Sequence, residues 1–176
     1  MKRILFVLAA LFLVSTMLLA RNDNVNSSEE QQAVAALPRN NSTTPEGWSD
    51  DLDAALKLAR EQKKFVLVLF TGSDWCGWCK KLKADTLMQS EFLDFSSKHL
   101  IKVYIDLPRE GLTDEQKMKN QQIMNSVCGD RAGFPTTVLM SKNGKTIGSI
   151  SGYLAEKEYL TKIKKIIKKH KNGTLK

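Results

Sequence analysis

The fold of this chain is decided by the stretch Phe65-Val66-Leu67-Val68-Leu69-Phe70-Thr71-Gly72-Ser73-Asp74-Trp75-Cys76-Gly77-Trp78-Cys79-Lys80-Lys81-Leu82. Its first six residues are apolar and rich in Val, Leu and Phe, which predicts a strand buried on both faces of a sheet. Turn-forming residues follow, and Asp74 stands where a helix cap is expected. Further on, Leu82, Leu87 and Met88 recur at roughly helical spacing, so the sequence predicts a helix that begins near the two cysteines.

The two cysteines, Cys76 and Cys79, fall in the first turn of this predicted helix. Unpaired backbone N–H groups and the positive end of the helix dipole stabilise a thiolate at that position. The thiol pKa is therefore expected below the free value of about 8.5. Because the cysteines are three residues apart, the second sulfur is able to attack the first within one helical turn and close a small disulfide loop.

A Cys-x-x-Cys pair has two other common uses, in zinc sites and in structural disulfides. Zinc needs four ligands, and the remaining candidates Cys128, His99 and His170 lie at no recognisable ligand spacing, so no metal site is expected. A purely structural disulfide would not call for a flanking Trp75, for a position at the start of a helix or for the loop around Pro135 further along the chain.

The segment Trp75-Cys76-Gly77-Trp78-Cys79-Lys80, preceded by an apolar strand, resembles the active site of the thioredoxin superfamily. Downstream, Gly133-Phe134-Pro135-Thr136-Thr137 and the apolar residues after it resemble the cis-proline loop and following strand of that superfamily. The resemblance covers roughly residues 48–170 and implies an α/β thioredoxin-like fold with a central mixed β-sheet flanked by helices.

The order of the expected elements agrees with this fold. Strands are expected over residues 65–70, 100–106, 136–140 and 146–150, with a hairpin turn at Asn143-Gly144. Helices are expected to open at residue 48, to begin near the cysteines, and to span about 90–98, 113–126 and 155–170.

The resemblance also implies roles for individual residues. Cys76 is the expected nucleophile and is expected to be exposed, and Cys79 is the expected resolving thiol that releases a mixed disulfide. The peptide bond before Pro135 is expected to be cis, with backbone groups presented to a substrate strand. The residues expected to support the site and bind substrate are Trp75, Gly77, Trp78, Phe134 and Pro135. No cofactor is expected beyond the redox-active Cys76–Cys79 disulfide.

Three positions depart from the thioredoxin pattern. Gly77-Trp78 replaces the Gly-Pro of thioredoxins, so their redox potential does not transfer to this chain. Phe70 stands six residues before Cys76, where thioredoxins bury an aspartate. Lys102 matches a lysine that accompanies that aspartate, and it is left without its expected carboxylate. Asp74 is a possible substitute acid, although capping already accounts for it.

The N-terminal residues predict export of the domain. Lys2 and Arg3 precede the apolar residues 4–14, and Ala20 is the best cleavage position, which together indicate a secretory signal peptide over residues 1–20. An uncleaved anchor is the alternative, because Leu18 is large for its position before the cleavage site. Residues 21–47 are polar and predict a flexible linker, and residues 48–176 form the expected thioredoxin-like domain.

The formal net charge of the chain is +8. Most of it lies in the last predicted helix, in Lys157, Lys162, Lys164, Lys165, Lys168, Lys169 and Lys171. A solvated outer face explains these lysines better than a nucleic-acid site, because no aromatic residues are interleaved for base stacking. Cys128 is expected to be a buried, inert thiol.

These features predict an exported, periplasmic thiol–disulfide oxidoreductase that reduces substrate protein disulfides. The chain looks closer to the periplasmic reductase branch of the superfamily, which includes the C-terminal domain of DsbD and DsbH-type reductases, than to DsbA-type oxidases. A membrane electron donor of DsbD type is implied, and a monomer is expected because the N-terminal segment is too short and polar for a dimerisation domain. The alternatives are a weak oxidase or isomerase, and a non-enzymatic binding or chaperone module.

Overall fold

The computed structural model describes residues 28–29, 32–129 and 133–173, so the predicted signal segment lies outside the described residues. The chain divides into a unit of residues 1–36 and a compact unit, Leu37–Lys176, that carries both landmark motifs. Within the described ranges, no helix is both long enough and apolar enough to cross a membrane.

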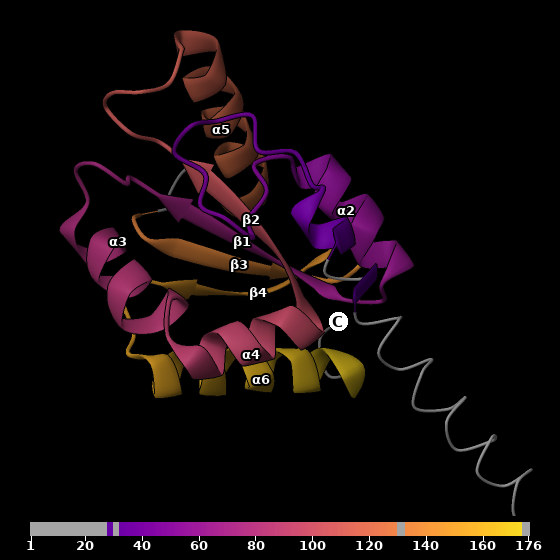
Figure 1. Cartoon of the computed structure of the whole chain (residues 1–176). Coiled ribbons are helices and arrows are strands. Elements are labelled where there is room, and N and C mark those ends of the chain that lie inside the picture. Colours follow the sequence, from indigo (N-terminus) through magenta and orange to yellow (C-terminus); the bar gives the residue numbers. More distant parts are fainter. Residues whose placement is uncertain (1–27, 30–31, 130–132, 174–176) are drawn as a thin grey trace, which may run out of the picture. The chain divides into compact units, whose positions relative to one another are not determined.

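A four-stranded mixed sheet forms the centre of this unit, in the strand order β2-β1-β3-β4 (Figure 1). Its strands are β1 (Phe65–Thr71), β2 (Leu100–Asp106), β3 (Thr136–Met140) and β4 (Thr146–Ser151). β1 pairs parallel with β2 and antiparallel with β3, and β4 completes an antiparallel hairpin with β3. The predicted mixed α/β sheet and the continuous burial of β1 after its first residue are confirmed.

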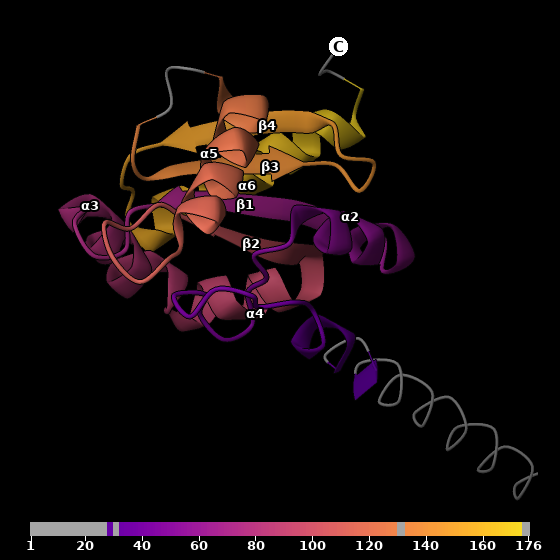
Figure 2. The ribbon, with the colours of Figure 1, turned by 90° about the horizontal axis from the view of Figure 1, so that it is seen from above.

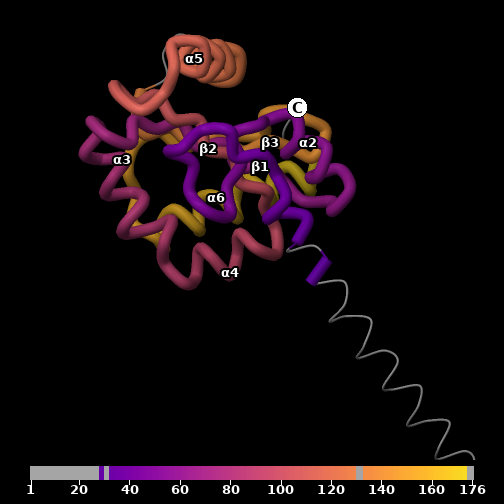
Figure 3. The backbone as a smooth tube through the Cα atoms, turned by 45° about the horizontal axis from the view of Figure 1, so that its top comes forward, coloured from indigo at the N-terminus to yellow at the C-terminus, as the bar shows by residue number. Residues whose placement is uncertain are grey.

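Helices cover both faces of the sheet. They are α2 (Leu52–Glu61), α3 (Gly77–Leu82), α4 (Ser90–His99), α5 (Asp114–Cys128) and α6 (Glu156–Lys171). Viewed from above, α5 crosses one face of the sheet (Figure 2), and α4 and α6 lie next to each other on the opposite face (Figure 3). The described elements thus form helix, sheet and helix layers, as the resemblance implies.

The core between the sheet and the layer of α3, α4 and α6 is built from the inward residues of β1. Leu67 and Leu69 belong to one buried cluster with Leu82, Phe92 and Tyr159, which come from these three helices. Phe92 and Tyr159 are fully buried and make an edge-to-face pair with ring centroids 6.0 Å apart. This cluster fixes α3, and with it the cysteine pair, against the end of β1.

The helix after the cysteines is shorter than predicted. α3 ends at Leu82, and a π-helical turn, η1, follows over Lys83–Leu87. Leu87 is buried as the apolar spacing predicts, but Met88 keeps 62 % of its surface exposed. The wider π turn shifts the residues after Leu82 around the helix axis, so that Met88 leaves the apolar stripe.

Residues ahead of Trp48 contribute to the compact unit. The buried carboxylate of Asp50 accepts hydrogen bonds from Asn40, from the backbone N–H of Asn41 at 2.6 Å and from the Thr44 hydroxyl at 3.0 Å. The compact unit accordingly begins at Leu37, ahead of the domain start expected at Trp48. A short bridge between Ser49 and β2 continues this contact with the sheet.

Candidate active site

The two cysteines form a disulfide at the start of α3, at the end of the sheet where β1 runs out. Their Cα atoms are 5.2 Å apart. Cys76 is the N-cap of α3, and its Sγ accepts a hydrogen bond of 3.1 Å from the backbone N–H of Cys79. The sulfur therefore meets one of the unpaired N–H groups that the sequence places at this helix start.

Both cysteines are nearly enclosed in this oxidised state. Cys76 keeps 6 % of its surface and Cys79 keeps 5 %. The expectation that Cys76 is exposed is therefore wrong for the disulfide-bonded form, because its Sγ turns inward to the Cys79 N–H group and to the partner sulfur.

Asp74 has a different role from the helix cap expected of it. Its carboxylate accepts hydrogen bonds from the backbone N–H groups of Arg109 and Glu110, at 2.9 and 3.2 Å, in the loop after β2. Desolvation opposes the negative charge, but these N–H groups outweigh it and hold the pKa of Asp74 below its ordinary value. Cys76 is the cap, so the prediction that Asp74 caps the helix is wrong.

Trp75 joins the cysteine loop to two other loops. Its indole N–H donates to the backbone oxygen of Leu107 at 2.9 Å, and its ring meets Phe134 edge-on with centroids 5.2 Å apart. The ring also lies against Gly72, where an added Cβ would come within 2.3 Å of an indole carbon. Trp75 keeps 39 % of its surface, so it contributes to the outer face of the site.

The second landmark lies beside the first, as predicted. The peptide bond between Phe134 and Pro135 is cis. The carbonyl oxygen of Pro135 accepts a hydrogen bond of 2.8 Å from the backbone N–H of Gly152, just after β4. The Trp75–Phe134 ring contact then brings this loop and the cysteine loop together.

Trp78 lies on the outer side of the cysteine pair, where 60 % of its surface is exposed. Its ring lies against Tyr153, with centroids 5.6 Å apart. The Tyr153 hydroxyl donates to Asp85 at 3.1 Å, and Lys81 lies over the Tyr153 ring while pairing with Asp85 at 2.6 Å. Hydrogen bonds from Lys81 and then Tyr153 lower the pKa of the Asp85 carboxyl. Sequence reasoning missed Tyr153, because it belongs to neither motif.

The departures from the thioredoxin pattern change what lies beneath the site. Phe70 is fully buried. Lys102 lies with its Nζ 5.3 Å from the Trp48 ring, and burial lowers its pKa. The buried acid next to the cysteine loop is Asp106, at the end of β2, which accepts hydrogen bonds from the backbone N–H and the hydroxyl of Ser73 at 2.9 and 2.6 Å.

A cavity of about 340 Å³ adjoins Cys79. Its lining residues are Thr71, Ser73, Cys79, Lys80, Lys83, Ala84, Met88 and Tyr104. Burial raises the pKa of Tyr104 to about 12, the charge of Asp106 adds to this effect, and a hydrogen bond with the side chain of Thr71 opposes it. Sequence reasoning missed Tyr104; its one signal is a hydroxyl-bearing ring in an otherwise largely aliphatic strand.

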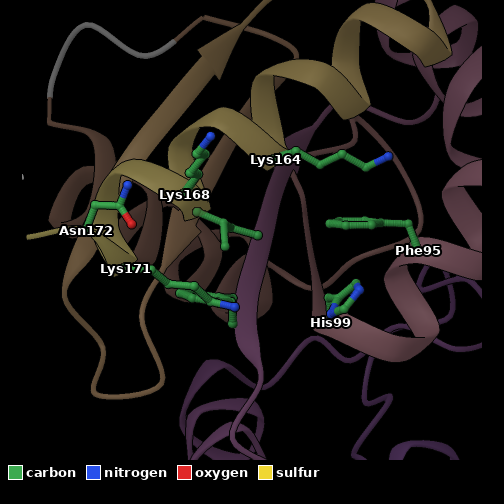
Figure 4. Close-up of a pocket in the computed structure, with 8 residues that line it drawn as sticks. Phe95, His99, Lys164, Lys168, Lys171 and Asn172 are labelled. Atoms are coloured by element: carbon green, nitrogen blue, oxygen red, sulfur yellow. The ribbon is translucent and has the colours of Figure 1, made fainter. Parts of the chain in front are cut away.

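A separate pocket of about 240 Å³ lies between α4 and α6 and contains no cysteine (Figure 4). Lys164 extends from α6 over the Phe95 ring, with its Nζ 5.3 Å from the centroid, and Lys171 lies 5.9 Å from the Phe65 centroid. Part of the lysine-rich face of α6 is thus folded over aromatic rings. No cluster of metal-ligating residues occurs in the described part of the chain.

Comparisons with known proteins agree with this geometry. Residues 52–167 match the family model of a thioredoxin-like domain. The chain is 34 % identical over 119 residues to the disulfide bond reductase DsbH of Chlamydia pneumoniae, covering 65 % of this chain and 69 % of that protein.

Solved structures extend the comparison. A DsbH oxidoreductase structure is 30 % identical with a TM-score of 0.62, covering 77 % of this chain and 88 % of the other. The oxidised C-terminal domain of DsbD from Neisseria meningitidis is 17 % identical with a TM-score of 0.50, covering 64 % and 90 %, and it supports the fold alone. The chain belongs to the thioredoxin-like domain family and is a DsbH-like thiol:disulfide oxidoreductase with a Cys76–Cys79 disulfide.

Proposed function

We propose that the protein is an exported reductase of protein disulfides. The observation that carries this proposal is the hydrogen bond of 3.1 Å from the Cys79 N–H group to the Cys76 Sγ at the start of α3. A hydrogen bond from a backbone N–H group favours the thiolate form of a cysteine, and the thiolate is the nucleophile. The similarity to a protein described as a disulfide bond reductase supports the direction of electron flow.

In the proposed cycle the reduced protein transfers two electrons to its substrate. The Cys76 thiolate attacks one sulfur of a substrate disulfide, which forms a mixed disulfide and releases the other substrate sulfur as a thiolate. Cys79 then attacks the Cys76 sulfur, so that the protein disulfide closes and the second substrate thiolate leaves. Trp75, Trp78 and Phe134 form apolar walls beside the sulfurs for the substrate chain.

The immediate surroundings of the cysteines favour a low redox potential. A strongly oxidising protein needs its thiolate stabilised far more than its disulfide. Gly77 and Trp78 bring neither a charge nor a side-chain donor directed at Cys76, and the Nζ of Lys80 donates to the backbone oxygen of Asp74 at 2.7 Å. We therefore place the potential nearer that of thioredoxin, about −270 mV, than that of DsbA, about −120 mV.

The proposal includes the compartment and the electron source. Residues 1–20 act as a signal peptide or anchor that exports the domain, and the residues between this segment and the start of the compact unit at Leu37 act as a linker. A reductase in an oxidising compartment has to be re-reduced, so we assign a membrane donor of DsbD type that passes electrons to the Cys76–Cys79 disulfide. Substrate proteins with disulfides are the partners on the other side.

A glutathione redox titration of the Cys76–Cys79 pair tests the direction of electron flow. The expected midpoint lies near −270 mV, and a tenfold change in the equilibrium corresponds to about 30 mV. In parallel, Cys76→Ser should abolish insulin reduction coupled to dithiothreitol, whereas Cys79→Ser should trap mixed disulfides with substrates. A midpoint above about −180 mV, the value of protein disulfide isomerase, would reject the reductase assignment in favour of an oxidase or isomerase.

A further inference from the structure

The resolving step of this cycle requires that the buried Cys79 thiol lose its proton. When Cys76 is bound to a substrate sulfur, Cys79 is a free thiol, and only its thiolate attacks a disulfide. Cys79 is 95 % buried in the disulfide form, because only 5 % of its surface is accessible. Burial raises a thiol pKa. The proton of Cys79 therefore needs a polar route out of the protein.

The face of the sheet next to Cys79 supplies hydroxyl groups at this place. In the parallel pairing of β1 with β2, Tyr104 lies opposite Leu69 and Thr71 lies opposite Asp106, so Thr71 and Tyr104 are diagonal neighbours on adjacent strands. Both are buried, and the Thr71 side chain acts on the Tyr104 hydroxyl. They line the 340 Å³ cavity together with Cys79. A cavity of this volume, with hydroxyl groups in its lining, has room for several water molecules, since one water occupies about 30 Å³ of liquid.

We propose that Tyr104, which lines this cavity together with Thr71 and Cys79, is a positioning residue that orders water there to take up the proton of Cys79 during resolution. This inference rests on the proposed function, in which Cys79 is the resolving thiol. Tyr104 acts by hydrogen bonding and stays protonated throughout. The raised pKa of about 12, which results mainly from burial, keeps its hydroxyl neutral and available as a donor at every pH at which the protein works.

The charges around the cavity agree with this role. Lys80 and Lys83 line it from the helical side and favour a thiolate at Cys79. The negative charge on the sheet side belongs to Asp106, and its carboxylate is engaged by the backbone N–H and hydroxyl of Ser73. Among the residues that line the cavity there is no carboxylate to act as a base, so water is the proton acceptor.

Water takes the proton of Cys79, and the resulting thiolate attacks the Cys76 sulfur. The Cys76–Cys79 bond forms while the bond between Cys76 and the substrate sulfur breaks, and the substrate leaves as a thiolate that is protonated by solvent. Two electrons pass from the protein dithiol to the substrate disulfide, and no further oxidant or reductant takes part.

The experiment separates attack by Cys76 from resolution by Cys79. The reduced protein is mixed rapidly with the disulfide of 5-thio-2-nitrobenzoate, which releases one coloured thiolate when Cys76 attacks and a second when Cys79 resolves. The first phase depends on reagent concentration and the second does not. All variants carry Cys128→Ala, so that only the two active-site thiols report, and the series is recorded from about pH 5 to pH 9.

The variants are Tyr104→Phe and Thr71→Val, with Tyr159→Phe as the matched control. Tyr159 is likewise a buried tyrosine with a threonine neighbour, since its hydroxyl shares a hydrogen bond of 2.8 Å with the hydroxyl of Thr137, but neither residue lines the cavity. Tyr104→Phe keeps the ring that packs edge-on against Trp48, with centroids 5.8 Å apart, so the fold is expected to survive.

We expect Tyr104→Phe to slow the second phase about tenfold at pH 7 and to move its pH midpoint up by about one unit, since one pKa unit changes the thiolate fraction tenfold. Thr71→Val should act in the same direction, and the first phase should not change. An unmoved midpoint in Tyr104→Phe, or an equal slowing in Tyr159→Phe, would overturn the inference. Failure of the reductase assignment would instead appear in the redox midpoint, which this measurement does not use.

Discussion

Replacing Gly72 by Ala tests whether the Trp75 ring holds the cysteine loop in place. A Cβ at position 72 would lie 2.3 Å from one indole carbon of Trp75 and 2.5 Å from two further indole atoms. Contacts below 3.0 Å do not occur for real Cβ atoms, so the ring has to retreat by about 1 Å to reach ordinary contact near 3.4 Å. The whole Trp75 ring has to move, because the contacting atoms belong to a rigid indole and cannot shift separately.

The expected loss of stability follows from the two contacts that the Trp75 ring loses when it moves. Its hydrogen bond to the Leu107 oxygen, 2.9 Å long, contributes about 0.5–1.5 kcal/mol. The edge-to-face contact with Phe134 contributes a further 0.5–1.5 kcal/mol or so. Because Trp75 is partly exposed, we expect the lower part of the combined range, about 1–2 kcal/mol off the free energy of unfolding, and a several-fold loss of kcat/KM for insulin reduction.

Gly77→Ala is the matched control, one residue after the first cysteine. An added Cβ there meets nothing within 4 Å, and Ala at the first turn of α3 favours the helix by a few tenths of a kcal/mol to about 1 kcal/mol. Urea unfolding of the oxidised proteins and insulin turnover would be measured side by side. Equal effects of the two substitutions, or a Gly72→Ala protein as stable and active as the parent, would refute the reasoning.

Three further predictions concern side chains away from the cysteine pair. Cys128→Ala should leave the redox midpoint unchanged, because burial raises the pKa of this free thiol; a covalent dimer that disappears in this variant on non-reducing gels would contradict it. Burial and then the charges of Lys171 and other lysines, Lys164 included, lower the pKa of His99. Its contribution to stability should therefore be complete above about pH 6.5 and decline as the pH falls toward the lowered value, and NMR titration should show the pKa of His99 rising in Lys164→Gln. Asp106→Ala should cost about 1.5–3 kcal/mol in urea unfolding, since a hydrogen bond to a charged group contributes that much; a loss below 0.5 kcal/mol would mean that the carboxylate does not hold the cysteine loop.

The strands were predictable because each is a local run of apolar residues between turn-forming residues. The ranges expected for β2 and β3 agree with the structure, and β1 and β4 each extend one residue further. The helix starts at Ser90 and Asp114 were equally predictable from the sequence. The helix that starts at Asp114 has the capping box that Thr113 and Gln116 predict. The cis bond before Pro135 followed from the resemblance alone.

Contacts between distant segments were not predictable in this way. Asp74 is a residue type that often caps helices and lies just before one, but its carboxylate accepts hydrogen bonds from residues 35 and 36 positions later in the chain. Thioredoxins bury an aspartate at the position that Phe70 occupies in this chain. Here the buried acid of this region is Asp106 at the end of β2, 36 positions later. Neither partner is visible from spacing, because a sheet places these residues side by side only after its strands have paired.

By itself, the sequence determined the elements, their order and the cysteine pair at a helix start, because each depends on propensities and patterns within a few neighbouring residues. Only the tertiary structure decided what surrounds the sulfurs: the Trp75 ring between Gly72 and Phe134, and the cavity in which Tyr104 lies beside Cys79. These arrangements depend on parallel pairing of β1 with β2 and on packing of Leu82 of α3 in one core cluster with Leu67 and Leu69 of β1. Long-range pairing of that kind leaves no periodic signal in the chain, and it is also what sets the environment of the reactive thiols.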